Sequence, residues 1–238
     1  MDSPGYTSLT RQSGLMREMQ SVANNIANLS TTGFRREGLI FSEYVSALEP
    51  QEASLSMAYA NVRSPSDVQG TLKPTGGTFD FAIEGDGFFQ VESDAGPMLT
   101  RAGGFTPNET GELVTYDGAR LLDAGGAPIF IPPDAQSISV ASDGTLSADG
   151  RPLTQIGLFT PTDPTDMQHR DGVRFEVPGG VDPVENANIV QGFLESSNVN
   201  AITEIARMIE VQHAYELGQK FLEQEDERIR NVLTTLSK

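Results

Sequence analysis

The side chains able to do acid–base or metal chemistry in this 238-residue sequence are two histidines, His169 and His213, and 33 aspartates and glutamates. There is no cysteine, which excludes a thiolate metal site, a cysteine nucleophile and a disulfide scaffold. Neither histidine stands in a zinc-binding spacing such as HExxH, and no nucleophile elbow or phosphate-binding loop occurs. His213 falls within a predicted helix, where a surface histidine is the ordinary interpretation. We therefore predict no catalytic residue, no metal site and no cofactor.

Acidic residues recur beside glycine, which raises two other possibilities. Loop carboxylates can bind calcium, and two carboxylates ~5–10 Å apart can hydrolyse a glycosidic bond. The sequence has no EF-hand loop pattern, and its Asp-Gly pairs follow no nine-residue period, so hairpin turns account for them better. An acidic β-sandwich enzyme that acts on a polysaccharide and a calcium-dependent adhesion module stay open as alternatives.

The formal net charge of −17 is unevenly distributed. Residues 1–36 carry two acids and four arginines, residues 199–238 carry seven acids and five bases, and the middle holds the other 24 acids and seven bases. So acidic a chain lacks the basic footprint that a phosphate backbone requires, and we expect no nucleic-acid partner. The acidic middle and the near-neutral ends indicate parts with different roles.

The sequence also argues against membrane insertion and a cleaved leader. No stretch reaches the ~18 apolar residues that a membrane span needs. Residues 1–20 lack the apolar core of a signal peptide. We expect neither membrane insertion nor secretion by the general signal-peptide route, while export without a cleaved signal stays open.

Both ends of the chain predict long helices. At the N-terminus a helix is expected over residues 4–29, with Ser3 as its cap and Pro4 in its first turn. It carries two stripes at helical spacing. One consists of Tyr6, Leu9, Ser13, Met16, Gln20, Ala23 and Ala27, and the other of Leu15, Met19, Val22, Ile26 and Leu29.

At the C-terminus, residues 199–236 predict a helix with a heptad seam. The seam consists of Met208, Val211, Tyr215, Gly218, Leu222, Glu225, Ile229, Val232 and Leu236. Helices of ~40 and ~55 Å cannot hide such stripes inside one small domain. We therefore expect the two helices to pack on each other or on neighbouring subunits.

Between the helices the hydrophobic period changes to two, which predicts strands. Short apolar runs are separated by glycine turns about ten residues apart, a spacing typical of an antiparallel sandwich or barrel. The turns expected to join hairpins are Gly85-Asp86-Gly87, Asp117-Gly118, Asp143-Gly144 and Asp149-Gly150. The predicted class is α+β, with a mainly antiparallel β middle and long helices that pair as a coiled coil. The predicted boundaries are an N-terminal helix and signature at 1–36, an irregular connector at 37–72, a β-rich outer domain at 73–178, a second connector at 179–198 and a heptad helix at 199–238.

Three asparagines, Asn24, Asn25 and Asn28, lie within five positions of the N-terminal helix although asparagine is a poor helix former. A frayed helix end whose side chains cap backbone groups would explain them. A polar seam that hydrogen-bonds between packed helices and fixes their register would explain them equally well.

Residues 21–34, SVANNIANLSTTGF, resemble the N-terminal signature of the bacterial flagellar rod and hook proteins. Three further blocks agree with that family in the expected order, namely residues 79–89, 100–106 and 194–200. Gly104 stands where the family commonly has asparagine, and residues 161–190 match loosely. The shortness of residues 38–72 favours a proximal-rod member over the distal-rod paralogue or the longer hook protein.

The resemblance implies a structural subunit of the flagellar basal-body rod and not an enzyme. Family members leave the cell through the flagellar export apparatus without a cleaved signal peptide, and their rod crosses the periplasm and transmits torque. Their terminal helices form a coiled-coil inner core, so the implied partners are copies of this chain and other rod proteins. The predicted assembly residues are Leu15, Met19, Val22, Asn24, Asn25, Ile26, Asn28, Leu29, Met208, Val211, Tyr215, Gly218, Leu222, Ile229 and Val232.

Overall fold

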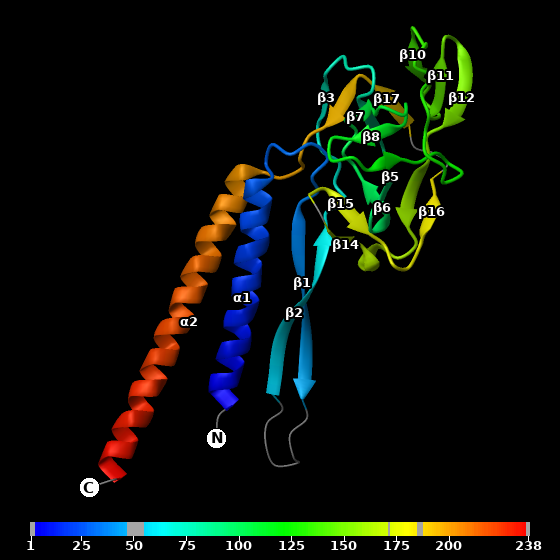
Figure 1. Ribbon diagram of the computed structural model, residues 1–238. Coiled ribbons are helices and arrows are strands. Elements are labelled where there is room, and N and C mark those ends of the chain that lie inside the picture. Colours follow the sequence, from blue (N-terminus) through cyan, green and yellow to red (C-terminus); the bar gives the residue numbers. More distant parts are fainter. Residues whose placement is uncertain (1–2, 47–54, 171, 185–187, 237–238) are drawn as a thin grey trace. The chain divides into compact units, whose positions relative to one another are not determined.

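The structure is a computed structural model that describes residues 3–46, 55–170, 172–184 and 188–236 (Figure 1). Within these residues the chain divides into two units by its internal contacts. The helical unit comprises residues 1–27, 37–63 and 200–238, and the β unit comprises residues 28–36 and 64–199. The chain therefore passes between the units four times, after residues 27, 36, 63 and 199.

Two long helices dominate the helical unit. Helix α1 (Ser3–Ala27) ends just before Asn28, slightly earlier than the predicted residue 29. Helix α2 (Ala201–Leu236) is 36 residues long and begins after Asn200, whose side-chain oxygen accepts the backbone N–H groups of Ile202 and Thr203 at 3.0 and 3.2 Å. This is the N-cap arrangement that satisfies donors left over in the first helical turn.

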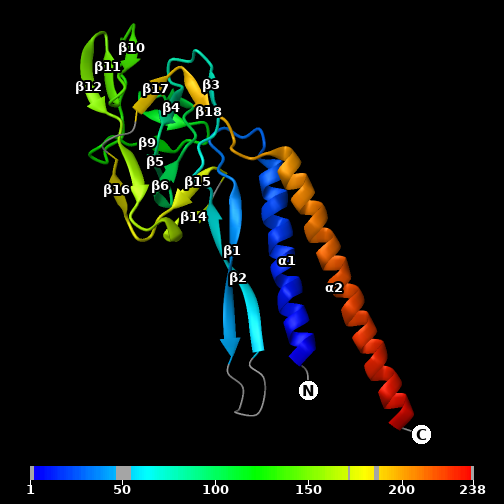
Figure 2. The same ribbon diagram turned by 180° about the vertical axis from the view of Figure 1, so that it is seen from behind.

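The helices lie side by side, as the views from both sides show (Figures 1 and 2). Val22 of α1 and Val211 of α2 are buried, and Arg207 Nε of α2 donates to Glu18 Oε1 of α1 at 2.6 Å. Bonds between Asn25 and Glu204 and between Glu18 and Arg207 show that α1 and α2 run in opposite directions.

The helical unit also contains a two-stranded sheet of β1 (Glu37–Ser46) and β2 (Leu55–Pro65). The expectation of an irregular connector over 37–72 was therefore wrong for these strands. Their sequences are rich in residues that favour strands, including Ile40, Tyr44, Val45 and Tyr59. The signal was missed because no Asp-Gly turn joins the two runs and polar residues interrupt their alternation.

The β unit is built from short antiparallel strands. Its main sheet has the order β14-β15-β6-β5-β9-β8-β7, with β13 pairing to both β5 and β16. A three-stranded sheet β10-β11-β12 and the pairs β17-β4 and β18-β3 complete it. The bounds are β3 (Leu72–Pro74), β4 (Phe81–Glu84), β5 (Phe88–Ser93), β6 (Gly96–Thr100), β7 (Phe105–Pro107), β8 (Leu113–Thr115), β9 (Arg120–Leu121), β10 (Ile138–Val140), β11 (Thr145–Ala148), β12 (Arg151–Gln155), β13 (Leu158–Pro161), β14 (Gln168–His169), β15 (Arg174–Glu176), β16 (Val181–Pro183), β17 (Asn188–Gln191) and β18 (Phe193–Glu195), with a 3-10 turn at Pro164–Asp166.

Two apolar clusters fill the β unit, a smaller one of Leu99, Phe159, Met167 and Phe175 and a larger one around three other phenylalanines. Phe81, Phe89 and Phe105 are buried in the larger cluster, and the rings of Phe89 and Phe105 meet edge to face with centroids 5.6 Å apart. Aliphatic residues from β5, β8, β9, β11 and β17 close around them. Burial of this kind is the main force that stabilises a small β unit.

Three of the four predicted hairpin turns are confirmed, at Asp117-Gly118 between β8 and β9, Asp143-Gly144 between β10 and β11, and Asp149-Gly150 between β11 and β12. The fourth was wrong. The turn at residues 85–87 joins β4 to β5, but β4 pairs with β17 while β5 pairs with β6, β9 and β13. The two glycines of this turn have φ angles of 106° and 104°, so it redirects the chain between two separate sheets.

The second connector expected to be irregular, residues 179–198, contains β16, β17 and β18. These strands pair with partners distant in sequence, such as Ile189 with Ile83 and Leu194 with Lys73. Local turn signals cannot reveal such pairing. The α+β class with a mostly antiparallel β middle is confirmed. No helix among the described residues combines the length and hydrophobicity needed to cross a membrane.

Candidate assembly residues and a buried motif cluster

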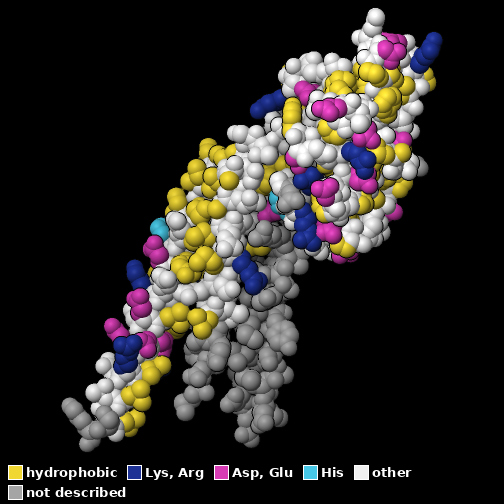
Figure 3. All heavy atoms as spheres, viewed as in Figure 1, with side chains coloured by type: hydrophobic (Ala, Val, Ile, Leu, Met, Phe, Trp, Pro, Cys, Tyr) yellow, Lys and Arg dark blue, Asp and Glu magenta, His cyan; other side chains and the backbone are white. Residues whose placement is uncertain are grey.

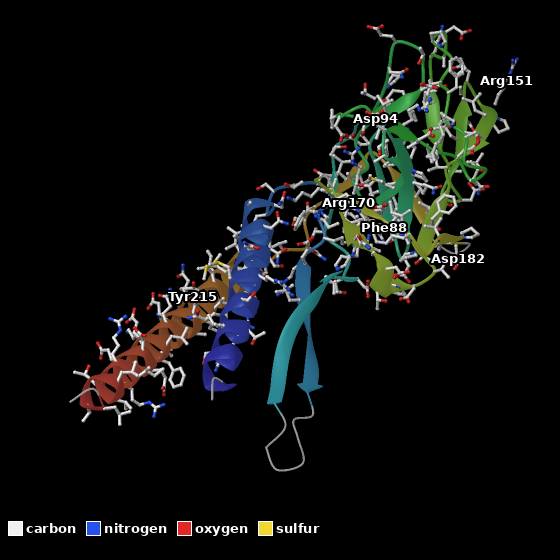
Figure 4. The ribbon with its side chains drawn as sticks, turned by 60° about the horizontal axis from the view of Figure 1, so that its bottom comes forward. Phe88, Asp94, Arg151, Arg170, Asp182 and Tyr215 are labelled. Carbon is white, nitrogen blue, oxygen red and sulfur yellow. The ribbon has the colours of Figure 1, made fainter. Side chains whose placement is uncertain are left out.

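The predicted assembly residues of the helical unit lie mainly along the surfaces where α1 and α2 meet. On α1, Val22 and Asn25 are buried, and the half-buried residues are Leu15, Met19, Asn24 and Ile26. On α2, Val211 is buried, and the half-buried residues are Met208, Tyr215, Gly218 and Leu222 (Figure 4 labels Tyr215). Ile229 and Val232, nearer the C-terminus, are 50% and 52% exposed. Asn28 and Leu29 are half-buried residues of the β unit.

Asn25 is the polar centre of the helical unit and is completely buried. Its Nδ2 donates to the carbonyl of Glu37 at 2.9 Å, and its Oδ1 accepts the N–H of Glu37 at 2.9 Å. The same Nδ2 donates to Glu204 Oε2 at 3.1 Å, and Ser21 Oγ donates to the Glu37 carbonyl at 3.2 Å. One amide therefore joins α1, the start of β1 and the first turn of α2.

Of the two explanations for the asparagine run, the structure supports the polar seam at Asn25. Asn25 hydrogen-bonds between packed elements, as the polar-seam explanation requires. Asn28 instead accepts a bond from Thr31 Oγ1 at 3.0 Å, which belongs to a local turn after the helix.

Gly218 lies against the side chain of Gln12, but its contact is loose. A Cβ at Gly218 would lie 3.5 Å from Gln12 Cγ, an ordinary packing distance. A cavity of about 450 Å³ surrounds the pair, lined by Ser8, Arg11, Gln12, Leu15, Ala214, Leu217, Gly218 and Phe221. The glycine is therefore not required here for close helix approach.

In the β unit, the carboxylate of Glu195 binds two arginines. Arg35 Nη2 lies 3.2 Å from Oε1 and Arg101 Nη1 lies 3.1 Å from Oε2, and all three side chains are at most 3% exposed. The N–H of Gly70 also donates to Oε1 at 2.9 Å. Arg101 Nη2 donates to the carbonyl of Gly85 at 2.8 Å.

The cluster places two cations around one anion. The guanidinium carbons of Arg101 and Arg35 lie 5.1 and 6.0 Å from the ring centre of Phe88, within cation–π range (Figure 4 labels Phe88). The pKa of Arg101 is lowered to about 10, mainly by burial and also by the neighbouring Arg35, while Glu195 opposes the shift. Burial likewise lowers the pKa of Arg35. We call Arg35, Phe88, Arg101 and Glu195 the motif cluster.

The backbone beside Arg35 is held by a close approach that only glycine allows. Gly33 has a φ of 70°, and its N–H donates to the carbonyl of Glu195 at 2.8 Å. A Cβ at Gly33 would lie 2.2 Å from the backbone nitrogen of Ala102. The next residue, Phe34, is buried, and its ring and that of His169 are nearly perpendicular with centroids 5.9 Å apart.

The side chain of Asn198 binds the peptide group that joins Arg35 to Arg36. Its Oδ1 accepts the N–H of Arg36 at 2.6 Å, and its Nδ2 donates to the carbonyl of Val68 at 2.6 Å. Each of the four sequence blocks in the resemblance thus supplies residues to one buried region. Sequence reasoning missed Arg35, Arg101 and Glu195, because these side chains come together only in the folded chain.

Among the described residues no group of three or more histidines, aspartates and glutamates is arranged to hold a metal ion. The polar side chains of the motif cluster bind other parts of the same chain.

Three family models match this chain, and together they define its class as the hook and rod proteins of the bacterial flagellum. Residues 6–35 match a model described as flagella basal body rod protein, and residues 82–148 match the flagellar hook protein FlgE/F/G D1 domain. Residues 190–235 match the flagellar basal body rod FlgEFG protein C-terminal model.

Individual relatives narrow the class. The chain is 39% identical to the flagellar basal-body rod protein FlgF of Mesorhizobium japonicum, over 89% of this chain and 88% of the relative. It is 38% identical to FlgF of Caulobacter vibrioides, over 100% and 99%, and 31% identical to FlgG of Bacillus subtilis, over 96% and 97%. The chain belongs to the flagellar basal-body rod protein family, and the predicted similarity to the proximal-rod member FlgF is confirmed.

Proposed function

We propose that this chain is a non-enzymatic subunit of the proximal rod that joins copies of itself and other rod proteins through α1 and α2. Its relatives named as basal-body rod proteins support a structural role in the rod. The observation that carries the mode of assembly is the amount of apolar surface on the two helices that the subunit itself leaves exposed.

One exposed apolar face lies near the start of α2. Ile202, Ile205 and Ile209 follow a spacing of three and four residues and are 81%, 51% and 48% exposed. Residues at that spacing share one helix face, which here points away from the α1-facing residues Glu204 and Val211. Figure 3 shows hydrophobic side chains gathered along the helical unit. Exposed apolar surface of this extent is typical of an interface.

A second exposed region lies on α2, where the heptad seam continues beyond the point that the N-terminal end of α1 reaches. Because α1 and α2 are antiparallel and Gln12 lies opposite Gly218, the backbone of α1 at Ser3 reaches roughly to residue 227 of α2. Ile229, Val232 and Leu236 lie beyond that point in the same seam. A helix from a neighbouring subunit that continued α1 along this seam would produce the proposed coiled coil.

The distribution of charge supports close packing of these ends. Residues 1–36 have a small positive net charge and residues 199–238 a small negative one, while the acidity lies in the remainder. Like copies can therefore approach through their helices without strong repulsion. Neighbours related by a rotation that does not close would build a helical rod, and such a rod can transmit torque.

The test compares two adjacent substitutions on the overhanging part of α2. Val232→Asp places a charge in the seam, and Asn231→Asp places the same charge on the next, exposed position. We expect both purified proteins to keep wild-type helix content, because both positions are exposed. Cells that produce Val232→Asp should lose basal-body rods and swimming, and cells that produce Asn231→Asp should keep them. Normal swimming with Val232→Asp would contradict assembly through this seam.

The proposal includes export through the flagellar export apparatus into a rod that crosses the periplasm, without removal of a signal peptide. Mass spectrometry of the subunit from isolated basal bodies tests this directly. The expected N-terminal peptide begins at Met1 or Asp2. A subunit that began further along the chain would show that a leader had been removed.

A further inference from the structure

All four passages of the chain between the units start from or return to one region of the β unit. Residues 28–36 have a passage at each end, residue 64 follows the third passage, and residue 199 precedes the fourth. The three segments that carry these ends, residues 28–36, 64–71 and 194–199, are joined to one another within the β unit.

Backbone hydrogen bonds connect the three segments pairwise. Ser66 N–H donates to the Arg36 carbonyl at 2.8 Å, and Ser196 N–H donates to the Thr71 carbonyl at 2.9 Å. Asn198 N–H donates to the Phe34 carbonyl at 3.3 Å. Each segment therefore holds both of the others.

Side chains of the motif cluster cross-link the same segments. Arg35 Nη1 donates to the carbonyl of Val68 at 2.5 Å, while its Nη2 binds Glu195. Glu195 in turn accepts the N–H of Gly70, and Asn198 binds both Arg36 and Val68. Arg101 fixes Glu195 from the β6 side.

Two glycines remove the space in which these segments could slide. A Cβ at Gly33 would lie 2.2 Å from Ala102 N, and a Cβ at Gly70 would lie 1.9 Å from the Ser196 carbonyl oxygen. In both cases the obstacle is backbone, which cannot rotate away as a side-chain tip can.

We propose that these segments and the motif cluster form a clamp that fixes all four chain passages to one rigid point of the β unit. The proposal rests on the proposed rod function, because its purpose is to carry torque between the units. A twisting force that arrives along any one passage is then shared by the other three. The force acts on buried ion pairs and on backbone hydrogen bonds instead of on a single flexible linker.

Burial makes the clamp open as a whole and not stepwise. Separating Glu195 from either arginine would leave an uncompensated charge away from water, which is far more costly than breaking an exposed ion pair. The excess positive charge in the cluster faces the Phe88 ring. A partly opened clamp is therefore poorly populated.

Trypsin tests the clamp on the purified chain, because Arg35 and Arg36 are built-in cleavage sites inside it. Gly33→Ala introduces a methyl group that cannot fit beside Ala102. Gly76→Ala is the matched control, since Gly76 has a φ of 71° against 70° for Gly33 but no atom within 4 Å of the added Cβ. Both variants therefore have the same backbone strain, and one alone has the clash.

We expect Gly33→Ala to speed cleavage after Arg35 and Arg36 roughly tenfold or more, with Gly76→Ala at the wild-type rate. Cleavage after Arg174 on β15 reports unfolding of the sheet and should not change. Equal protection of Arg35 and Arg36 in both variants would overturn the clamp. Should Gly33→Ala also expose Arg174, Asn198→Ala decides the question. Faster cleavage after Arg36 with Arg174 protected supports the clamp, and an unchanged rate overturns it.

Cells separate failure of the clamp from failure of the rod function. Cells with Asn198→Ala should swim at the wild-type speed in dilute medium. In viscous medium, where torque is high, their speed should fall severalfold further than the speed of wild-type cells does. Wild-type behaviour under load, in a strain that cannot swim without this gene, would overturn the clamp alone. Swimming after deletion of the gene would overturn the rod function. The trypsin result would be unaffected, because it is measured on the purified chain.

Discussion

The two units each contain a buried polar centre, but of different chemistry. In the helical unit a neutral amide, Asn25, lies at the centre and binds the backbone of the buried Glu37 and the buried side chain of Glu204. In the β unit it is an anion between two cations, Arg35 and Arg101 around Glu195. A buried amide selects one register at modest cost, whereas a buried ion cluster is strongly destabilising once a partner is lost. We therefore expect the β unit to depend more strongly on its polar centre than the helical unit does.

The apolar surfaces of the two units differ in the same sense. The β unit buries Phe81, Phe89 and Phe105 in a closed core. The helical unit leaves large apolar side chains exposed along both helices, and they include Leu9, Met16, Ile202, Ile205, Leu217, Phe221, Ile229, Val232, Leu233 and Leu236. The β unit exposes fewer large apolar side chains, namely Val68, Tyr116, Phe130 and Leu153.

Among substitutions that test the comparison of the two polar centres, Glu195→Gln is expected to lower stability most. The substitution removes the carboxylate that binds both arginines of the cluster and leaves two buried cations together. We expect the free energy of unfolding of the β unit to fall by about 3–5 kcal/mol. Urea denaturation followed by far-ultraviolet circular dichroism measures it.

Glu92→Gln is the control for this prediction. Glu92 also binds an arginine, Arg120 at 2.7 Å, but both side chains are about two-fifths exposed. The expected loss is about 1 kcal/mol or less. Equal losses in the two variants would show that burial of the motif cluster has no special role.

The sequence predicted those parts of the fold that local patterns determine. Helical spacing predicted the last residue of α1 and the first residue of α2 to within two positions, and Asp-Gly pairs located three hairpins. The strand pair β17-β4 joins Ile189 to Ile83, more than a hundred residues apart, and no local signal carries that information. Strands β1 and β2 were missed for the opposite reason, because their pattern is local but irregular.

The candidate sites show the same limit. Asn25 was selected because asparagine is unfavourable within a helix, and the sequence left capping and a polar seam equally open. Arg35, Arg101 and Glu195 caused no local conflict, since a charged residue in a turn or at a strand end is ordinary. Only their convergence in space distinguishes them, and it depends on pairings such as β18 with β3.

Asn25→Ala is expected to have a smaller effect than Glu195→Gln, confined to the helical unit. It removes the side-chain bonds to Glu37 and Glu204, and leaves the buried Glu204 carboxylate without this donor. We expect a loss of about 1–3 kcal/mol, partly offset by the better helix propensity of alanine. Thermal melting of the helical circular dichroism signal measures it.

Gln20→Ala is the matched control for Asn25→Ala, because Gln20 lies on the exposed side of α1. Its effect should be within about 0.5 kcal/mol. If Asn25→Ala melted like Gln20→Ala, the polar centre of the helical unit would have no stabilising role, and the comparison with the motif cluster would fail.

The smallest expected effect concerns acid pH and the surface turns of the β unit. Asp149 has a φ of 51°, and its carboxylate accepts the N–H groups of Ser137 and Gln136 at 2.9 and 3.1 Å. The bond from Ser137 N–H is the main reason that the pKa of Asp149 lies below the ordinary 3.8. A lowered folded-state pKa means that the carboxylate stabilises the fold above pH 3.8, and that this contribution disappears as the pH falls through the folded-state value.

Asp149→Asn isolates that contribution, because asparagine tolerates the positive φ and does not titrate in this range. The melting temperature of wild type should exceed that of Asp149→Asn at pH 6 by a small margin, and the two should converge as the pH falls below about 3.8. Asp143, held by Thr145 in the same way, provides a second variant with the same expected pH dependence. A gap that stayed constant down to acid pH would mean that the difference comes from the shape of the turn and not from the charge. The β unit would then owe its acid sensitivity to groups other than its surface turns.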